Sequence, residues 1–162
     1  MKSNKTSTTS SVMGRVKSSY PRVRRILVPL DFSGKSRQAL RYATPIAEKF
    51  SAKIFLLHVI QANYSAAPEV RALPISRGQT SAALRRLDEM AATYVPKALR
   101  GKSLVTIGSP YREILAAAQR LDVDMIALTT HGSTGLKRFF VGSTAEQVMR
   151  HAACPVLSVR SQ

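Results

Sequence analysis

The sequence is short of cysteine, aromatic and acidic residues. Among its 162 residues are one cysteine, no tryptophan and nine acids. Cys154 therefore has no internal disulfide partner, which suits a reducing compartment, and we expect a cytoplasmic protein. No apolar run approaches the roughly 18 residues of a membrane span, so no such helix is predicted. The histidines and the cysteine lack metal-ligand spacing, so no zinc site is predicted either.

Positive charge is abundant instead. The chain has 25 Lys and Arg residues and a net charge of +16. Seven basic residues and no acid lie within residues 1–25: Lys2, Lys5, Arg15, Lys17, Arg22, Arg24 and Arg25. A basic surface attracts phosphate-bearing partners such as nucleotides, nucleic acid or anionic lipid, without choosing among them. The nucleic-acid alternative lacks an aromatic-rich basic strand of the kind that stacks bases.

The first 20 or so residues are rich in Ser, Thr and Lys and almost free of large aliphatic side chains. Such a segment buries too little apolar surface to offset its ordering entropy, so residues 1–22 are predicted to be a disordered basic tail. The tail has no apolar h-region and is not a secretory signal. An untargeted tail fits it better than an organelle transit peptide. Residues 23–162 then form one domain.

From Arg25 onward, short apolar runs alternate with longer amphipathic ones. The short runs predict five strands: Arg25–Leu30, Lys53–Val59, Ser103–Ile107, Met125–Leu128 and Pro155–Val159. Helical spacing predicts helices from a cap at Ser33 to Phe50, from about Thr80 to Leu99 with Leu84 on its apolar face, from Pro110 to Leu121, and over about 144–152. Residues 60–79 are predicted to form a loop.

Continuous apolar strands separated by helices predict an α/β fold, a single doubly wound five-stranded parallel sheet with helices on both faces. In such sheets, ligands bind beyond the carboxyl ends of the strands, where the strand order reverses. This rule points to the segments that follow the strands ending near Leu30, Val59 and Leu128.

The segment after the fourth strand has the character of a phosphate site. Gly132 and Gly135 allow close approach of the backbone to a ligand, and residues 142–144 open a helix whose free N–H groups and dipole favour an anion. Two basic residues of this loop add positive charge: Lys137 and Arg138. The alternative is that the glycines form turns and Ser143 caps the helix. The spacing matches neither the Walker signature nor the dinucleotide fingerprint.

Several segments together resemble the universal stress protein family. They are the opening ILVPLDFS, the His58-Val59 strand end, the block THGSTGLKRFFVGSTAEQV and the closing HAACPVLSV, and the similarity covers about residues 23–160. The family's ATP-binding members carry Gly, two residues, Gly, nine residues and then Gly-Ser or Gly-Thr. Gly132, nine residues and Gly142-Ser143 match this spacing, while Thr129 stands where the first glycine is expected.

The resemblance implies a Rossmann-like fold of the adenine nucleotide alpha hydrolase type, and an ATP-binding regulator or sensor of the stress response. It implies Asp31 and Pro29 near the sugar and base, and Val59 giving backbone contacts to adenine. The phosphates would lie in a cradle beside Thr129: Gly132, Gly142, Ser143 and Thr144. A homodimer through Pro155–Val159 is implied as well, and the apolar edge of that strand agrees with it.

More than one role is open for several residues, and more than one function is open for the protein. Asp31 could bind ribose hydroxyls, bind a Mg²⁺ ion that bridges phosphates, or cap the helix start. His58 is expected to be a satisfied polar group, His151 to suit a helix C-terminus, Cys154 to be a buried unreactive thiol, and His131 to make a polar contact. The functional alternatives are a slow ATPase or phosphotransferase, for which only Asp31 offers a base, and a dimeric family member that uses no nucleotide.

Overall fold

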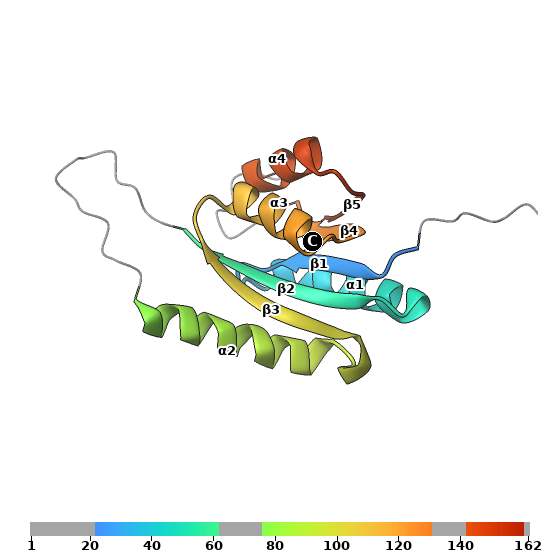
Figure 1. The fold of residues 1–162 in the computed structure, drawn as a ribbon, viewed down its shortest axis with the longest axis horizontal. Coiled ribbons are helices and arrows are strands. Elements are labelled where there is room, and N and C mark those ends of the chain that lie inside the picture. Colours follow the sequence, from blue (N-terminus) through green and yellow to red (C-terminus); the bar gives the residue numbers. More distant parts are fainter. Residues whose placement is uncertain (1–21, 62–75, 131–141, 161–162) are drawn as a thin grey trace, which may run out of the picture.

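The structure, a computed structural model, describes residues 22–61, 76–130 and 142–160. These ranges contain five strands: β1 (Arg25–Pro29), β2 (Lys53–Ile60), β3 (Arg100–Ile107), β4 (Met125–Thr129) and β5 (Val156–Val159). Within the same ranges, four α-helices and a short 3-10 helix alternate with the strands (Figure 1): α1 (Ser36–Phe50), α2 (Arg77–Tyr94), η1 (Lys97–Leu99), α3 (Pro110–Arg120) and α4 (Ser143–His151).

The strands form one sheet in the order β3-β2-β1-β4-β5, and all neighbours are parallel. The central strand β1 pairs with β2 from Arg25 opposite Lys53 to Pro29 opposite Leu57. The chain moves outward from β1 to β3, and α3 then carries it back to β4 on the other side of β1. The strand order therefore reverses between β1 and β4, which confirms the predicted doubly wound parallel sheet.

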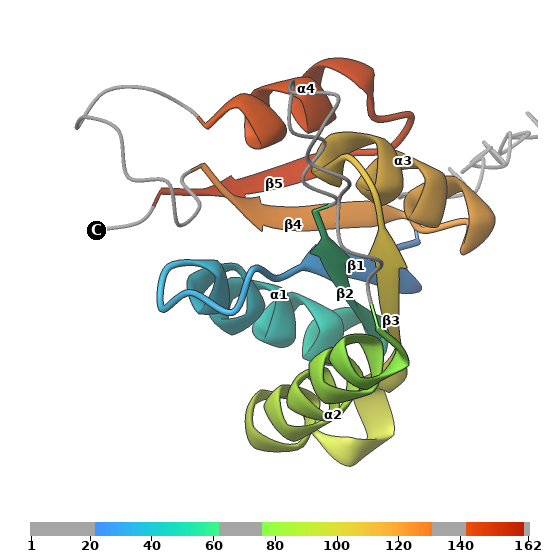
Figure 2. The ribbon, with the colours of Figure 1, turned by 90° about the vertical axis from the view of Figure 1, so that its left-hand side faces the viewer.

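Helices cover both faces of this sheet, with α1 and α2 on one face and α3 and α4 on the other (Figure 2). Successive residues of β1 alternate between the two cores. Ile26 and Val28 pack with α1 and α2, whereas Leu27 packs with α3 and α4. All three side chains are fully buried. Burial on both faces is the reason that the strands read as continuous apolar runs.

The bounds of α2 differ from the prediction of about Thr80 to Leu99. The helix begins after Ser76, whose hydroxyl accepts from the Gln79 amide at 3.2 Å while the Gln79 side chain accepts from the Ser76 amide at 2.8 Å. It ends before Pro96, which cannot continue a helix, and η1 replaces the last predicted turn. Leu84 is 38% exposed, so its placement on the apolar face was wrong.

The start of α1 follows a tight turn after β1. The helix begins at Ser36 and its N-cap is Lys35, so the predicted cap at Ser33 was wrong. The Ser33 hydroxyl accepts from the Ser36 amide at 3.0 Å within the preceding turn. One face of the helix is buried at Ala39, Leu40, Ala43 and Ala47. Phe50 is the last residue of the helix and is 48% exposed.

The predicted tail over residues 1–22, except Arg22, lies outside the described ranges, as does most of the loop predicted over 60–79. Strand bounds also shift: β3 begins earlier than Ser103, and β5 begins after Pro155. The ends of β1, β2 and β4 each differ from the prediction by one residue. Among the described helices, none has the length and apolar character that a membrane crossing needs.

Candidate functional site

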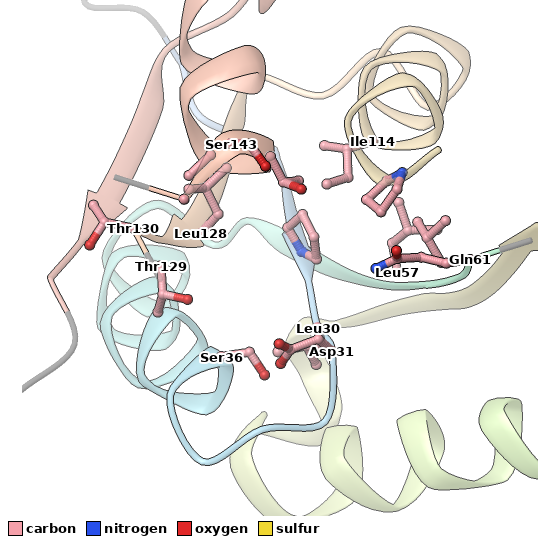
Figure 3. Close-up of a pocket in the computed structure, with 16 residues that line it drawn as sticks. Leu30, Asp31, Ser36, Leu57, Gln61, Ile114, Leu128, Thr129, Thr130 and Ser143 are labelled. Atoms are coloured by element: carbon pink, nitrogen blue, oxygen red, sulfur yellow. The ribbon is translucent and has the colours of Figure 1, made fainter. Parts of the chain in front are cut away.

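A pocket opens at the carboxyl ends of β1 and β4, where the strand order reverses. Its lining comes from the ends of β1, β2 and β4 and from the starts of α1, α3 and α4 (Figure 3). We call it the switch-point pocket.

Every predicted site residue within the described ranges lines this pocket: Pro29, Asp31, Val59, Thr129, Gly142, Ser143 and Thr144. They come from four segments that are far apart in the sequence. The remaining predicted residue, Gly132, lies outside the described ranges, together with His131, Lys137 and Arg138. The structure thus brings together the segments after β1, β2 and β4 that the strand-end rule selected.

The start of α4 lies against the end of β4. The Gly142 amide donates to the Thr130 carbonyl oxygen at 2.6 Å, and the Thr130 amide donates to the Val159 carbonyl oxygen at 3.0 Å. These two bonds tie the first residue before α4 to the sheet. The N-terminus of α4 therefore opens into the switch-point pocket next to Thr129 and Thr130.

Gly142 is the N-cap of α4, with φ −60° and ψ 143°. Ser143 is the first helical residue, so the alternative in which Ser143 caps the helix was wrong. Gly142 has an ordinary backbone conformation, so φ does not require a glycine there. A glycine N-cap has no side-chain acceptor for the first-turn amides, so the N–H groups of residues 143–145 lack an intrahelical partner at the pocket wall.

Asp31 occupies the other side of the pocket, at the end of β1. Its Oδ1 accepts from the Ser33 amide at 2.9 Å, and the intervening Phe32 has a positive φ of 63°. The Asp31 carboxylate thus holds the turn into α1 while its residue lines the pocket. The predicted helix-cap role is therefore present as a turn contact, alongside any role toward a ligand.

The turn that carries Asp31 is supported from β2. His58 Nδ1–H donates to the Leu30 carbonyl oxygen at 2.8 Å, which confirms that His58 is a satisfied polar group at a strand end. The His58 ring lies 4.2 Å from the Phe32 ring, centroid to centroid. The Arg86 guanidinium lies 4.4 Å from the centroid of the same Phe32 ring, as a cation–π contact.

The pocket wall combines apolar and polar side chains. Leu57 lies beside Gln61 on one side, and Leu128 lies near Thr129 and Thr130 on the other (Figure 3). Among the described lining residues, Asp31 is the only one with an ionisable side chain. An anion beside the Thr129 and Thr130 hydroxyls would therefore be held by amide and hydroxyl donors. Such a pocket suits a ligand with both apolar and polar parts.

Residues 22–160 match the family model described as the universal stress protein family. The chain belongs to this family. The sequence of the universal stress protein MJ0531 of Methanocaldococcus jannaschii is 31% identical over 144 residues, which are 85% of this chain and 82% of that protein.

Solved structures of the family share the fold. The structure of MJ0577, from the same archaeon, has a TM-score of 0.75 and 27% identity, over 87% of this chain and 98% of that one. Two more distant structures hold adenine nucleotides. A universal stress protein in complex with cAMP has 18% identity and a TM-score of 0.64, over 87% of this chain and 99% of that one. A universal stress protein of Archaeoglobus fulgidus in complex with dAMP has 18% identity and a TM-score of 0.55, over 85% and 98%.

In this universal stress protein the pocket also takes residues that sequence reasoning missed. Gln61 follows β2, Pro110 and Ile114 belong to α3, and Ser36 opens α1. Gln61 could have been found, because it follows one of the selected strand ends. The α3 residues could not, because nothing in their local pattern places that helix over the ends of β1 and β2.

The other predicted polar residues lie away from the pocket. His151 Nδ1–H donates to the Gln147 carbonyl oxygen at 2.9 Å, which confirms its helix C-terminal role. Cys154 is half-buried, less than predicted, and this burial and the nearby Asp124 carboxylate raise the pKa of its thiol. Among the described residues, no group of three or more His, Cys, Asp or Glu side chains is arranged to hold a metal ion.

Proposed function

We propose that this universal stress protein binds ATP in the switch-point pocket and acts as a nucleotide-dependent regulator or sensor of the stress response. One observation carries the proposal. The open N-terminus of α4 and the Asp31 carboxylate face one pocket from opposite sides, at the switch point of the sheet. A nucleotide has an anionic end and a hydroxyl-bearing end, and these two features match them.

The phosphates bind at the α4 side. The amides of residues 143–145 are available donors, and the helix dipole favours negative charge there. The hydroxyls of Ser143 and Thr144 add donors from the first turn, and Thr129 adds one from the end of β4. Gly132, which the family motif matches, completes the cradle. Thr129 replaces the motif's first glycine, and its hydroxyl donates to the ligand in this account.

The sugar and the base bind at the other side. Asp31 accepts hydrogen bonds from ribose hydroxyls or binds a Mg²⁺ ion that bridges the phosphates. Pro29 and Val59 contact the sugar and adenine, and the apolar side chains of Leu57 and Ile114 give the base a surface to pack on. The relatives solved with cAMP and dAMP support an adenine nucleotide as the ligand class.

A regulatory role is favoured over catalysis. Phosphoryl transfer needs a positioned base or nucleophile and charge stabilisation in line with the leaving group. Asp31 is the only ionisable side chain among the described lining residues, and it already accepts from the Ser33 amide. ATP occupancy would instead change what the protein presents to partners.

The proposed assembly is a homodimer in which two copies of the chain associate through β5. Among the strands that the structure describes, β5 lies at the edge of the sheet and pairs with β4 alone. An unprotected strand edge presents unpaired backbone donors and acceptors to a second copy. The cytoplasmic location expected from the cysteine content stays a prediction.

The test is the identity of any nucleotide that copurifies. The purified protein is denatured, and the supernatant is resolved by ion-exchange chromatography. ATP, or its product ADP, in near-stoichiometric amount supports the proposal, and Gly132→Val protein prepared in parallel is expected to carry none. Absence of nucleotide, together with no ATP binding by calorimetry, would favour the nucleotide-free alternative. Timed incubation with ATP separates a slow ATPase from a sensor.

A further inference from the structure

We propose that the edge of the sheet opposite the switch-point pocket binds nucleic acid through its phosphate backbone. This edge is where β1, β2 and β3 begin (Figure 1). The chain segments 22–25, 48–53 and 95–102 meet there, as the pairing of Arg25 with Lys53 and of Ile54 with Arg100 records. We call this surface the basic edge.

The basic edge concentrates positive charge. Its three segments carry eight Lys and Arg side chains against one carboxylate, Glu48. Favourable interaction with a helix dipole explains little of this positive charge, because only Lys49 among the eight cations lies in the last turn of an α-helix. A surface with an excess of positive charge attracts a polyanion over distances of about 8–10 Å at physiological salt.

Three of the eight cations are used inside the fold. Arg25 pairs with Asp122. The Lys53 ammonium donates to the Ala98 carbonyl oxygen at 2.7 Å. The Arg100 guanidinium donates to the carbonyl oxygens of Val95 at 2.8 Å and Ala92 at 3.1 Å, where α2 ends. The Lys53 and Arg100 contacts hold η1 and the start of β3 in place. Contacts within the fold therefore account for the positive charge of these three residues, and no binding partner is needed to explain it.

The other five have no such explanation: Arg22, Arg24, Lys49, Lys97 and Lys102. All five are exposed. Within the part of the chain that the structure describes, none of their side chains makes a hydrogen bond or an ion pair. The nearby Asp124 carboxylate does not neutralise them through contact, because it accepts from the backbone amides of Arg24 and Arg25 at 2.7 and 2.8 Å.

The sequence that precedes the basic edge is basic as well. Residues 1–21 contain four cations and no acid, with many Ser and Thr hydroxyls: Lys2, Lys5, Arg15 and Lys17. Lys, Arg, Ser and Thr are among the side chains that contact phosphate oxygens in nucleic-acid complexes.

A nucleic acid fits this composition better than an anionic membrane. Stable attachment to a lipid surface adds buried apolar side chains to the charge attraction. Residues 1–21 contain almost no large aliphatic side chains, and Phe50 is the only large apolar side chain that is exposed in the described segments of the basic edge. The contacts expected are to the backbone, so binding is independent of base sequence and steeply dependent on salt.

The test compares two variants of the full chain with equal loss of charge. The first changes the five exposed cations of the basic edge to glutamine. The control changes five other exposed cations on α1, on α2 and just before α1: Lys35, Arg37, Arg41, Arg77 and Arg85. Binding to a labelled mixed-sequence DNA duplex is followed by fluorescence anisotropy over a series of salt concentrations. Circular dichroism checks that both variants are folded.

Wild type is expected to bind with a log–log salt slope of several units. The basic-edge variant is expected to lose at least about tenfold in affinity and about two units or more of slope, while the control loses less than about threefold. Equal losses would show that only net charge matters and would overturn the assignment. So would binding to phosphatidylserine vesicles without binding to DNA, or no binding to either. DNA binding retained in a protein that cannot bind ATP separates this surface from the proposed function.

Discussion

The Gly142 amide donates to the Thr130 carbonyl oxygen at 2.6 Å. This bond joins two residues twelve positions apart and sets the N-terminus of α4 beside the end of β4. The geometry of the proposed phosphate site therefore depends on this hydrogen bond between Gly142 and Thr130. Because Gly142 has φ −60° and ψ 143°, other residues can replace it without backbone strain, which makes it a clean position for mutation.

Gly142→Asp is expected to separate stability from binding. Aspartate is a good N-cap and suits the helix dipole, so the free energy of unfolding should stay equal or rise by about 0.3 kcal/mol. Its carboxylate would stand against the ATP phosphates, and like charges near 4 Å repel by several kcal/mol, about 4 at an intermediate dielectric. ATP affinity by calorimetry should fall at least about tenfold.

Gly142→Asn is the matched control, because asparagine caps equally well and carries no charge. It should lose much less affinity than the aspartate variant. Similar losses in both would mean that the side-chain volume, and not an anion at the helix start, controls binding.

Asp31→Asn tests the role of the carboxylate without loosening the turn. The asparagine Oδ1 can still accept from the Ser33 amide, as Asp31 Oδ1 does at 2.9 Å. If Asp31 binds a bridging Mg²⁺, the variant should lose several-fold more affinity for ATP in Mg²⁺ than in EDTA. Equal losses in the two buffers would assign Asp31 to the ribose hydroxyls instead. No loss in either would remove Asp31 from the site.

Ser158→Pro tests the homodimer. The carbonyl oxygens of Pro155 and Val159 accept from the amides of Ile126 in β4 and of Thr130 just after it, so the alternate residue Ser158 directs its amide outward. Proline is tolerated on an edge strand at such a position and removes only the outward donor. Light scattering should show dimers for wild type and for Ser158→Thr, and mostly monomers for Ser158→Pro. A dimeric proline variant would place the interface elsewhere.

Cys154 is expected to be a slow nucleophile. Burial and, secondly, the Asp124 charge raise the pKa of its thiol, so the thiolate is scarcer near neutral pH than in the unfolded chain. Alkylation by iodoacetamide between about pH 7 and 9 should be slower in the folded protein than in denaturant. Asp124→Asn removes a charge that disfavours the thiolate and should speed alkylation. A folded-state rate that equals the denatured one would contradict this.

Much of the fold follows from local patterns that the structure confirms. Fully buried residues such as Ile26, Leu27 and Val28 make a strand apolar at every position, and that pattern identifies a sheet covered on both faces. Boundaries were harder, because they depend on side-chain bonds. The start of α2 is set by the mutual bonds of Ser76 and Gln79, and no apolar periodicity reports them.

The pocket shows the same division. Asp31 and Thr129 were predictable because they follow strands at the switch point, a position fixed by topology. Ile114 was not, because it lines the pocket only through the path of α3 over the sheet, which is a tertiary property. The dihedral angles of Gly142 were also unforeseen, since a glycine in a sequence does not reveal whether its freedom is used.

The most direct test of the central claim is calorimetric titration of nucleotide-stripped protein with MgATP. The account predicts saturable binding of one ATP per chain, with the affinity reduced at least about tenfold by Gly142→Asp and little changed by Gly142→Asn. Saturable binding that both variants leave intact, or no heat of binding in wild type, would contradict a triphosphate held by the N-terminus of α4.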